Sequence, residues 1–209
     1  MMSLLRTSMP PDNDQQLQDD TVYLRAPIMS DFPQWVTLRA SSREFLRPWE
    51  PIWPVDDLTR GAFRRRLRRY AQERREGRCY PFLLFSLAND RLLGGATISN
   101  VRRGVTQACS LGYWMGEEYA GKGFMTKAVA LIMPFCFDVL RLHRIEAACL
   151  PHNQPSQHLL EKVGFTKEGY ARRYLCINGE WRDHLLFACV SDDARPLSRV
   201  TLHNPATDR

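Results

Sequence analysis

The residues with the clearest chemical potential form the fifteen-residue run GYWMGEEYAGKGFMT at positions 112–126. A strand-like segment ends there in a turn containing Gly121 and Gly123, and a long amphipathic helix follows. Glycines let a backbone approach a ligand closely and direct several N–H groups into one small volume. The N-terminus of the helix adds a partial positive charge. This run is therefore suited to binding a phosphate or pyrophosphate through its backbone.

Two known phosphate-binding motifs match this run, and neither match is complete. Gly116 and Gly121-Lys122 fit a Walker A loop, but Gly123 stands where a magnesium-binding Ser or Thr belongs. The dinucleotide fingerprint G-x-G-x-x-G fails because Thr126 occupies its third glycine position. Two interpretations remain. The run is either a pyrophosphate-binding turn of another kind or only a tight strand-to-helix turn.

Composition points to one domain. The chain has 209 residues, 44% of them hydrophobic, which is ample for a core. We expect a single domain over 21–190, a disordered N-terminal arm over 1–20 and a flexible tail over 191–209. The sequence contains no run of about 18 apolar residues and no secretory signal, so we predict neither a membrane span nor export.

The cysteines indicate neither disulfides nor a metal site. All six lie in apolar stretches and none forms a C-x-x-C pair, so we expect buried free thiols in a cytoplasmic protein. Cys149, His152 and His158 are a conceivable zinc-binding set, but they lack a fourth ligand at the usual spacing. We therefore predict no metal site.

Positive charge is concentrated in one segment. The net charge is +6, and nine arginines between residues 60 and 78 face only Glu73 and Glu76. Apolar residues recur in this segment at helical spacing: Phe63, Leu67, Tyr70 and Ala71. The spacing predicts an amphipathic helix with a basic outer face. That face is either simply solvated or docks onto a polyanion such as ribosomal RNA.

The elements that position these residues alternate between strands and helices. Strands are expected at 21–27, 79–87, 92–101, 107–115, 143–150, 165–177 and 180–190. Helices are expected at 30–42 and 60–78, from the glycine turn to about 140, and from Asn153 to Gly164. Pro134 should kink the third of these helices. The order predicts one α/β domain in which helices cross over a mixed sheet.

The order of motifs resembles the GCN5-related N-acetyltransferase (GNAT) family over about residues 21–190. The motifs are Ala120–Met125 between a strand and a helix, Asn153-x-x-Ser156 between the next strand and helix, and Gly164-Phe165. Other segments resemble the RimJ branch, the ribosomal-protein-alanine N-acetyltransferases: FLRPWEP at 45–51, ISNV at 98–101, PHN at 151–153, KEGYA at 167–171 and WRDH at 181–184. The resemblance implies a mostly antiparallel central sheet, flanked by helices, that splays between its fourth and fifth strands.

The family resemblance also implies acetyl-CoA as co-substrate. Its pyrophosphate should lie against the backbone after Ala120, and its pantetheine arm should follow the fourth strand into the splay. Asn153 should contact the pantetheine end or a water beside it. The expected cofactor-binding residues are Leu111, Tyr113, Trp114, Met115, Gly121, Lys122, Gly123, Phe124, Met125, Thr126, Asn153 and Ser156.

The residue that protonates the departing thiolate has to differ from the family's usual tyrosine, because that position is Leu160 here. Ser156 lies four residues earlier on the same helix face and is the predicted substitute, as in the RimJ and RimL branches. Its alternative is an ordinary small polar residue at a helix start. Tyr170 is a second candidate acid, or otherwise a packing tyrosine.

A protein α-amine has a pKa of about 8, against about 10.4 for lysine, so a catalytic base removes its proton easily at neutral pH. Glu50 lies in an apolar loop with Trp49 and Trp53, and it is the candidate base or anchor for the amine. Its alternative is a surface glutamate or a loop-bracing hydrogen bond. Asp183 is a weaker candidate. No cysteine has the neighbours of an activated nucleophile, which favours direct transfer without an acetyl-enzyme.

The expected function is acetyl transfer to the N-terminal α-amine of a protein, such as a ribosomal protein, by a cytoplasmic monomer or homodimer. Two alternatives remain open. One is acetylation of a small amine or antibiotic, and the other is a non-catalytic acyl-CoA- or RNA-binding module. The glycine turn together with the Glu50 loop argues against the module, and the arginine-rich segment favours a protein acceptor over a small amine.

Overall fold

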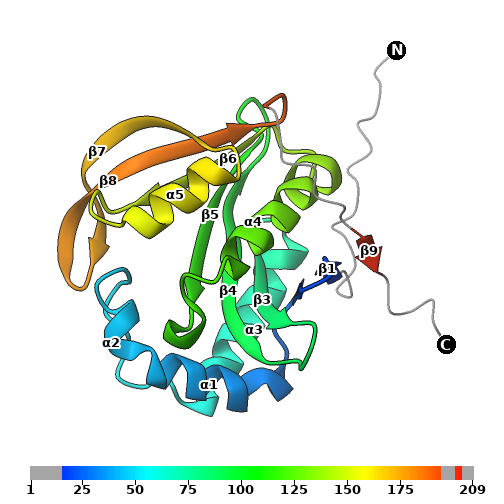
Figure 1. The fold of residues 1–209 in the computed structure, drawn as a ribbon, viewed down its shortest axis with the longest axis vertical. Coiled ribbons are helices and arrows are strands. Elements are labelled where there is room, and N and C mark those ends of the chain that lie inside the picture. The colour runs from blue at the N-terminus through cyan, green and yellow to red at the C-terminus, as the bar shows by residue number, and fades with distance from the viewer. Residues whose placement is uncertain (1–15, 194–200, 204–209) are drawn as a thin grey trace.

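The computed structural model describes residues 16–193 and the backbone of 201–203. In these residues, nine strands form one sheet in the order β7-β8-β6-β5-β4-β3-β2-β1-β9 (Figure 1). The strands are β1 (Gln16–Gln18), β2 (Val22–Arg25), β3 (Tyr80–Ser86), β4 (Leu92–Arg102), β5 (Ala108–Met115), β6 (Arg144–Cys149), β7 (Thr166–Ile177), β8 (Glu180–Val190) and β9 (Thr201–His203). The helices are α1 (Phe32–Ser41), α2 (Arg43–Leu46), α3 (Arg60–Arg75), α4 (Phe124–Pro134) and α5 (Gln154–Lys162).

The sheet is mixed, which confirms the predicted fold class. Its described neighbours pair antiparallel, except that β5 and β6 run parallel. The parallel pairing extends only from Ala108 with Arg144 to Ser110 with Glu146. Beyond Ser110 the two strands diverge, and the described pairing of β5 over Leu111–Met115 is with β4 alone. This is the predicted splay between the fourth and fifth strands of the sequence analysis.

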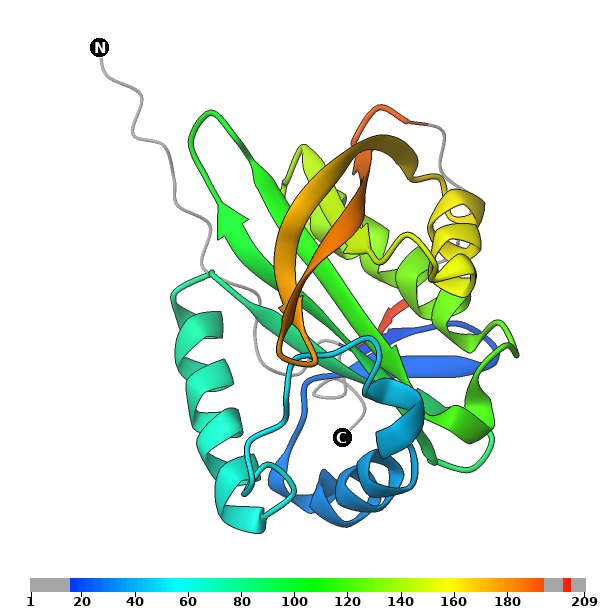
Figure 2. The same cartoon turned by 90° about the vertical axis from the view of Figure 1, so that its left-hand side faces the viewer.

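Helices cover both faces of the sheet and bury two separate cores. Side chains that alternate along β2 and β3 point to opposite faces. Leu24 and Leu84 pack with the residues of α4 and α5, whereas Tyr23 and Phe85 pack with α1 and α3. Figure 2 shows α3 on one side of the strands and the α4–α5 pair on the other. Each face of the sheet therefore has its own helical layer.

The helix predicted to kink at Pro134 changes type there. Pro134 is the last residue of α4, and Phe135–Val139 continue as a π-helical turn. In this turn the Leu140 N–H donates to the Phe135 carbonyl at 2.9 Å, one residue further back than in an α-helix. Proline has no N–H and crowds the carbonyl four residues earlier, and the wider turn begins at the residue directly after it.

Three predictions need correction. Residues 16–18 form β1 inside the segment expected to be disordered, and 201–203 form β9 inside the expected flexible tail. β1 pairs with both β2 and β9, and the Leu17 side chain is fully buried. One leucine between glutamines gives too short a pattern to reveal a strand. The remainder of both segments lies outside the described residues. Cys176 is exposed on β7, whereas the other five cysteines are buried as expected.

No helix in the described part of the chain is long and apolar enough to cross a membrane.

Candidate active site

A cleft of about 450 Å³ opens where the end of β5 faces the starts of α4 and α5. We call it the α4–α5 cleft. It brings together most of the residues predicted to bind the cofactor: Tyr113, Trp114, Met115, Gly121, Gly123, Phe124, Met125, Thr126, Asn153 and Ser156. Glu50 also lines it. These residues come from a loop, a strand and two helices, so the fold assembles the cleft from segments distant in sequence.

Two predicted residues do not line this cleft with their side chains. The Leu111 side chain is buried in the core, so only its backbone faces the gap between β5 and β6. Lys122 is exposed, and its ammonium lies 5.9 Å from the centroid of the Tyr119 ring.

Several lining residues were missed by the sequence analysis, and a signal existed for some of them. Pro155, His158, Leu159 and Lys162 lie on α5 at spacings of three, four and seven residues from the first of them, which is one helix face. That periodicity follows Asn153 directly in the sequence. Tyr119 lies in the turn before the two glycines, where no periodic pattern marks it.

The glycine turn forms an open cradle at the start of α4. Gly121 and Gly123 have φ angles of +72° and +80°, which favour glycine over other residues. A Cβ built on either residue would meet no atom within 4 Å. Because α4 begins at Phe124, its first N–H groups have no partner inside the helix. An open cradle of free N–H groups fits the pyrophosphate of acetyl-CoA.

A hydroxyl pair spans the α4–α5 cleft. The Tyr113 hydroxyl on β5 lies 2.7 Å from Ser156 Oγ in the first turn of α5. The Asn153 side chain caps α5 by accepting a hydrogen bond of 3.2 Å from the Ser156 N–H. Burial raises the pKa of Tyr113 to about 12. The sequence analysis named both Tyr113 and Ser156 as cofactor-binding residues but did not predict their contact, because no local pattern pairs residues on separate elements.

Tyr170, the second candidate acid, lies elsewhere. It is 55% exposed on β7 and donates a hydrogen bond to Asp183, which also accepts from the Arg173 N–H at 2.7 Å. This bond raises the pKa of Tyr170 and lowers that of Asp183. Both residues border a separate hollow on the β7–β8 hairpin, so the structure does not bring Tyr170 together with Ser156.

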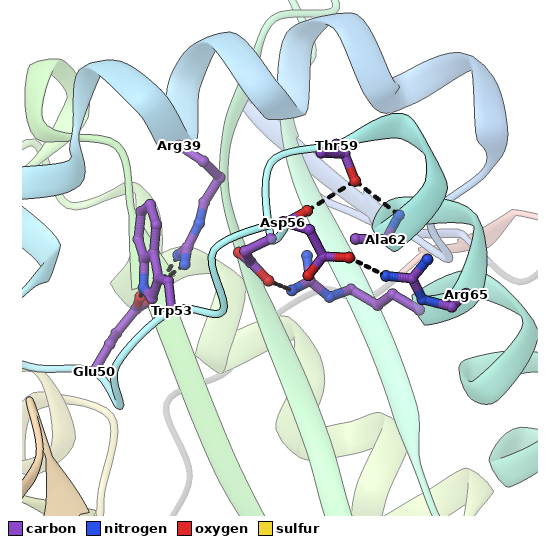
Figure 3. Close-up of polar contacts among 9 residues, drawn as sticks. Arg39, Glu50, Trp53, Asp56, Thr59, Ala62 and Arg65 are labelled. Carbon is purple, nitrogen blue, oxygen red and sulfur yellow. Dashed lines mark hydrogen bonds and ion pairs between the residues drawn. The ribbon is translucent and has the colours of Figure 1, made fainter.

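Glu50 is held by an ion pair that the sequence did not predict. The two terminal nitrogens of Arg39 donate to its two carboxylate oxygens at 2.7 Å each, and Trp53 Nε1 donates to Oε2 at 2.7 Å (Figure 3). Arg39 is only 7% exposed, and its guanidinium lies 4.1 Å from the Trp53 ring centroid and 4.8 Å from that of Trp114. A buried arginine needs a carboxylate, and Glu50 supplies it.

The Glu50 loop is fixed at its backbone as well. The Asn178 N–H, at the turn between β7 and β8, donates to the Glu50 carbonyl at 2.9 Å. The loop and the hairpin therefore close against each other beside the splayed strands.

A second cleft, of about 350 Å³, lies on the α1 and α3 side of the sheet. We call it the α1–α3 cleft. Its walls include aromatic residues and the buried ion pairs of Arg39 with Glu50 and of Arg66 with Asp57. Glu50 and Trp114 line both clefts. Two hollows on opposite faces thus meet at these side chains, where a group could pass from one bound molecule to another.

The family of GNAT acetyltransferase domains matches residues 21–166 of this chain. The [ribosomal protein uS5]-alanine N-acetyltransferase of Escherichia coli is 39% identical over 157 residues, covering 75% of this chain and 81% of that protein. RimJ of Mycobacterium smegmatis in complex with CoA-disulfide superposes with a TM-score of 0.80 at 34% identity, covering 86% of this chain and 88% of that one. The ribosomal-protein-S5-alanine acetyltransferase of Vibrio fischeri superposes with a TM-score of 0.80 at 31% identity, covering 87% of this chain and 99% of that one.

The chain belongs to the GNAT family of acetyltransferases. It is an N-acetyltransferase with acetyl-CoA as co-substrate, and its relatives include enzymes of the RimJ type, as the motifs predicted.

Proposed function

We propose that this enzyme acetylates the N-terminal α-amine of a protein, with a ribosomal protein as the acceptor. The observation that carries the proposal is the meeting of two clefts at Glu50 and Trp114. The α4–α5 cleft holds acetyl-CoA, and the α1–α3 cleft receives the acceptor from the other face of the sheet. Relatives named for acetylation of ribosomal-protein alanine support this choice of acceptor. Such an acceptor also places the enzyme in the cytoplasm.

In this proposal some residues bind the cofactor and others position the reacting groups. Acetyl-CoA supplies an acetyl group activated as a thioester. Gly121 and Gly123 place backbone N–H groups around the pyrophosphate, and Ser156 lies in the same cleft to serve the departing sulfur. The backbone of β5 from Leu111 onward, free of β6, pairs with the pantetheine arm and polarises the carbonyl.

Glu50 anchors the amine in this scheme. A carboxylate offers about four lone-pair sites, and Arg39 and Trp53 occupy three of those on Glu50. The remaining site, on Oε1, can accept one hydrogen bond from the incoming ammonium. Because Arg39 balances the charge of Glu50, the carboxylate is better placed to orient the amine than to remove its proton. Water is then the base, which an α-amine with a pKa of about 8 allows.

The proposal is tested by incubating the enzyme with acetyl-CoA, N-terminal peptides of ribosomal proteins and a panel of small amines, and following acetylation by mass spectrometry. We expect acetylation of peptide α-amines, with peptides blocked at the N-terminus left unmodified even where they contain lysine. Turnover of small amines with none of the peptides would overturn the proposal.

We also propose that helix α3 contacts ribosomal RNA. Arg64, Arg68 and Arg75 are exposed on one face of α3, and within the described residues no carboxylate lies in salt-bridge distance of them. The neighbouring Arg65 and Arg66 are instead paired with Asp56 and Asp57 (Figure 3 shows the first pair). Carboxylates of the described residues therefore neutralise only part of the positive charge of this helix.

The unpaired arginines also repel one another. Two pairs of arginines stand four residues apart on the helix: Arg60 with Arg64, and Arg64 with Arg68. Like charges at this spacing destabilise a helix by roughly 0.2–0.5 kcal/mol per pair. A polyanion would relieve this cost. Arginine suits phosphate recognition because its planar guanidinium binds phosphate through two parallel hydrogen bonds. Leu67 and Tyr70 of the same helix line the α1–α3 cleft, so the basic face adjoins the proposed acceptor site.

A further inference from the structure

We propose that Tyr113 is a positioning residue that acts through Ser156: the two hydroxyls form a neutral chain that aims the Ser156 hydrogen at the sulfur of bound CoA and stabilises its thiolate. This inference rests on the proposed binding of acetyl-CoA in the α4–α5 cleft. It assigns Ser156 a hydrogen bond to the leaving group in place of the proton transfer that the sequence analysis expected of it.

The geometry of the pair supports this role. Tyr113 projects from β5 after that strand has left β6, and Ser156 lies in the first turn of α5 across the cleft. Their oxygens are 2.7 Å apart. The Ser156 N–H donates a hydrogen bond of 3.2 Å to the Asn153 side-chain oxygen, and this bond holds the backbone of the serine in place. Both hydroxyls line the cleft, so the pair stands at the place that the splayed strands open for a pantetheine arm.

The direction of the hydrogen bond follows from counting donors and acceptors. A buried tyrosine hydroxyl needs an acceptor for its hydrogen, and Ser156 Oγ is the acceptor that the described residues offer. A serine hydroxyl has one hydrogen and two lone pairs. If Tyr113 donates to Ser156, the serine hydrogen is left for a second acceptor. In the described residues the Cys149 sulfur is within hydrogen-bond reach of Ser156, and a CoA sulfur bound in the cleft would take its place.

The relative pKa values of Tyr113 and the CoA thiol determine whether the hydroxyl pair gives the thiolate a hydrogen bond or a proton. Burial raises the pKa of Tyr113 to about 12, whereas an ordinary thiol has a pKa of about 8.5. Passing a proton along the chain to the thiolate is therefore unfavourable by a factor on the order of 10³. The chain stays protonated and offers the thiolate a charge-assisted hydrogen bond, which is stronger than a bond between neutral groups.

The proton balance is met by the acceptor instead. The C–N bond forms as the C–S bond breaks, and the amine nitrogen must lose a proton to become an amide. The amine attacks in its neutral form, after its ammonium, with a pKa of about 8, has lost a first proton to water. Once the C–N bond has formed, the nitrogen is positively charged and more acidic than that ammonium, so it is a far better proton source for a thiolate than Tyr113 or Ser156. The proton passes from that nitrogen to sulfur through water. The partial positive charge at the N-terminus of α5 supports the thiolate in the meantime.

The Cys149 thiol beside the pair is also neutral, whereas Glu50, His158 and Lys162 line the same cleft. Burial raises the pKa of the nearby Cys149 thiol, so it stays protonated at neutral pH. The hydroxyl pair thus faces no permanent negative charge from this neighbour that would disfavour a thiolate.

The test is the thiol pKa of bound CoA. It is read from thiolate ultraviolet absorbance against pH, as the difference between the CoA and desulfo-CoA complexes, because the protein's own cysteines then cancel. We expect a wild-type value below that of free CoA. Tyr113→Phe and Ser156→Ala should each weaken thiolate formation by about tenfold or more, on the scale of one hydrogen bond to a charged group. The double variant should match Ser156→Ala, since both changes break one chain.

Two controls keep the outcomes separate. Ser156→Thr keeps the hydroxyl and should retain a thiol pKa near wild type. Desulfo-CoA affinity should be the same in all variants, because it lacks the sulfur. A wild-type thiol pKa in Tyr113→Phe, with a raised one in Ser156→Ala, would overturn the role of Tyr113. An unchanged value in both would overturn the pair. Failure of the wild-type protein to bind desulfo-CoA would instead overturn the cofactor cleft on which the inference rests.

Discussion

Single side chains in this enzyme take their chemistry from a partner. Glu50 lies in an aromatic loop, where an unpaired carboxylate would be a strong base, but Arg39 and Trp53 occupy most of its lone pairs. Ser156 is a weak acid alone and becomes an oriented hydrogen-bond donor beside Tyr113. Each of these pairs determines which step its members can serve.

Replacing Glu50 separates an anchor from a base. Glu50→Gln leaves the buried guanidinium of Arg39 without a counter-charge, and we expect a loss of about 2 kcal/mol in the free energy of unfolding. Activity toward peptides should fall to a similar extent across the whole pH range. Urea unfolding and kcat/KM from pH about 6 to 9 measure both effects.

The matched control is Glu44→Gln, because Glu44 pairs with Arg47 at the surface, where the two side chains are 78% and 59% exposed. We expect Glu44→Gln to lower the free energy of unfolding by less than about 0.5 kcal/mol. Wild-type stability in Glu50→Gln, with activity lost chiefly at low pH where the amine is protonated, would identify Glu50 as the base.

The glycine cradle gives a second prediction at this scale. Gly123→Glu should abolish acetyl-CoA binding, because the new side chain would bring negative charge to the pyrophosphate position. Gly104→Glu is the matched control, since Gly104 also has a positive φ angle, +68°, and open space around its Cβ, but it lies in the β4–β5 turn. Calorimetry should show binding lost in the first variant and kept in the second. Equal affinities in both would move the cofactor away from this turn.

At the scale of elements, α3 combines an internal and an external task. Phe63 is buried against α1, whereas Arg64, Arg68 and Arg75 face solvent. The structure narrows the choice among the arginines, since Arg65 and Arg66 already have carboxylate partners. Binding of phosphates to this face should therefore depend on Arg64, Arg68 and Arg75, which lie on it together.

Reversing these three charges tests the contact. Arg64→Glu, Arg68→Glu and Arg75→Glu together should weaken binding to a labelled RNA hairpin of about 20 nucleotides and lower the slope of log affinity against log salt by about 2–3. Fluorescence anisotropy over a salt series measures both.

The charge-matched control is the variant with Arg91, Arg141 and Lys167, all exposed and outside α3, changed to Glu. It should keep most of the salt slope. An RNA affinity that ignores both salt and the α3 changes would leave the basic face merely solvated. Competition by polyglutamate but not by RNA would point to an acidic protein partner instead.

What the sequence could reveal depended on distance along the chain. The glycine turn and the Asn153 cap follow from local rules, since positive φ angles and helix caps act within a few residues. Arg39 with Glu50, and Tyr113 with Ser156, lie 11 and 43 residues apart and meet only through tertiary packing. The sequence therefore predicted the cradle, Glu50, Tyr113 and Ser156, but neither Arg39 nor the contact within either pair.

At the scale of the whole molecule, two clefts have walls in common, and our proposal assigns one to the acetyl donor and the other to the acceptor. The α4–α5 cleft and the α1–α3 cleft share Glu50 and Trp114. A donor and an acceptor can therefore be bound at once without competing for one entrance. The helical layers lie on either side of the strands (Figure 2).

This arrangement predicts how a joined ligand binds. A conjugate that links the CoA sulfur through an acetyl bridge to the α-amine of an acceptor peptide can occupy both clefts. Its second contact is then intramolecular, so we expect affinity at least about 10²-fold above that of CoA. The control is the same conjugate attached through a lysine side chain at the peptide's far end, which should bind little better than CoA. Calorimetry distinguishes them. Equal affinities for both conjugates would mean that the clefts do not meet at the reacting amine, because only a shared junction rewards linking the ligands at that atom.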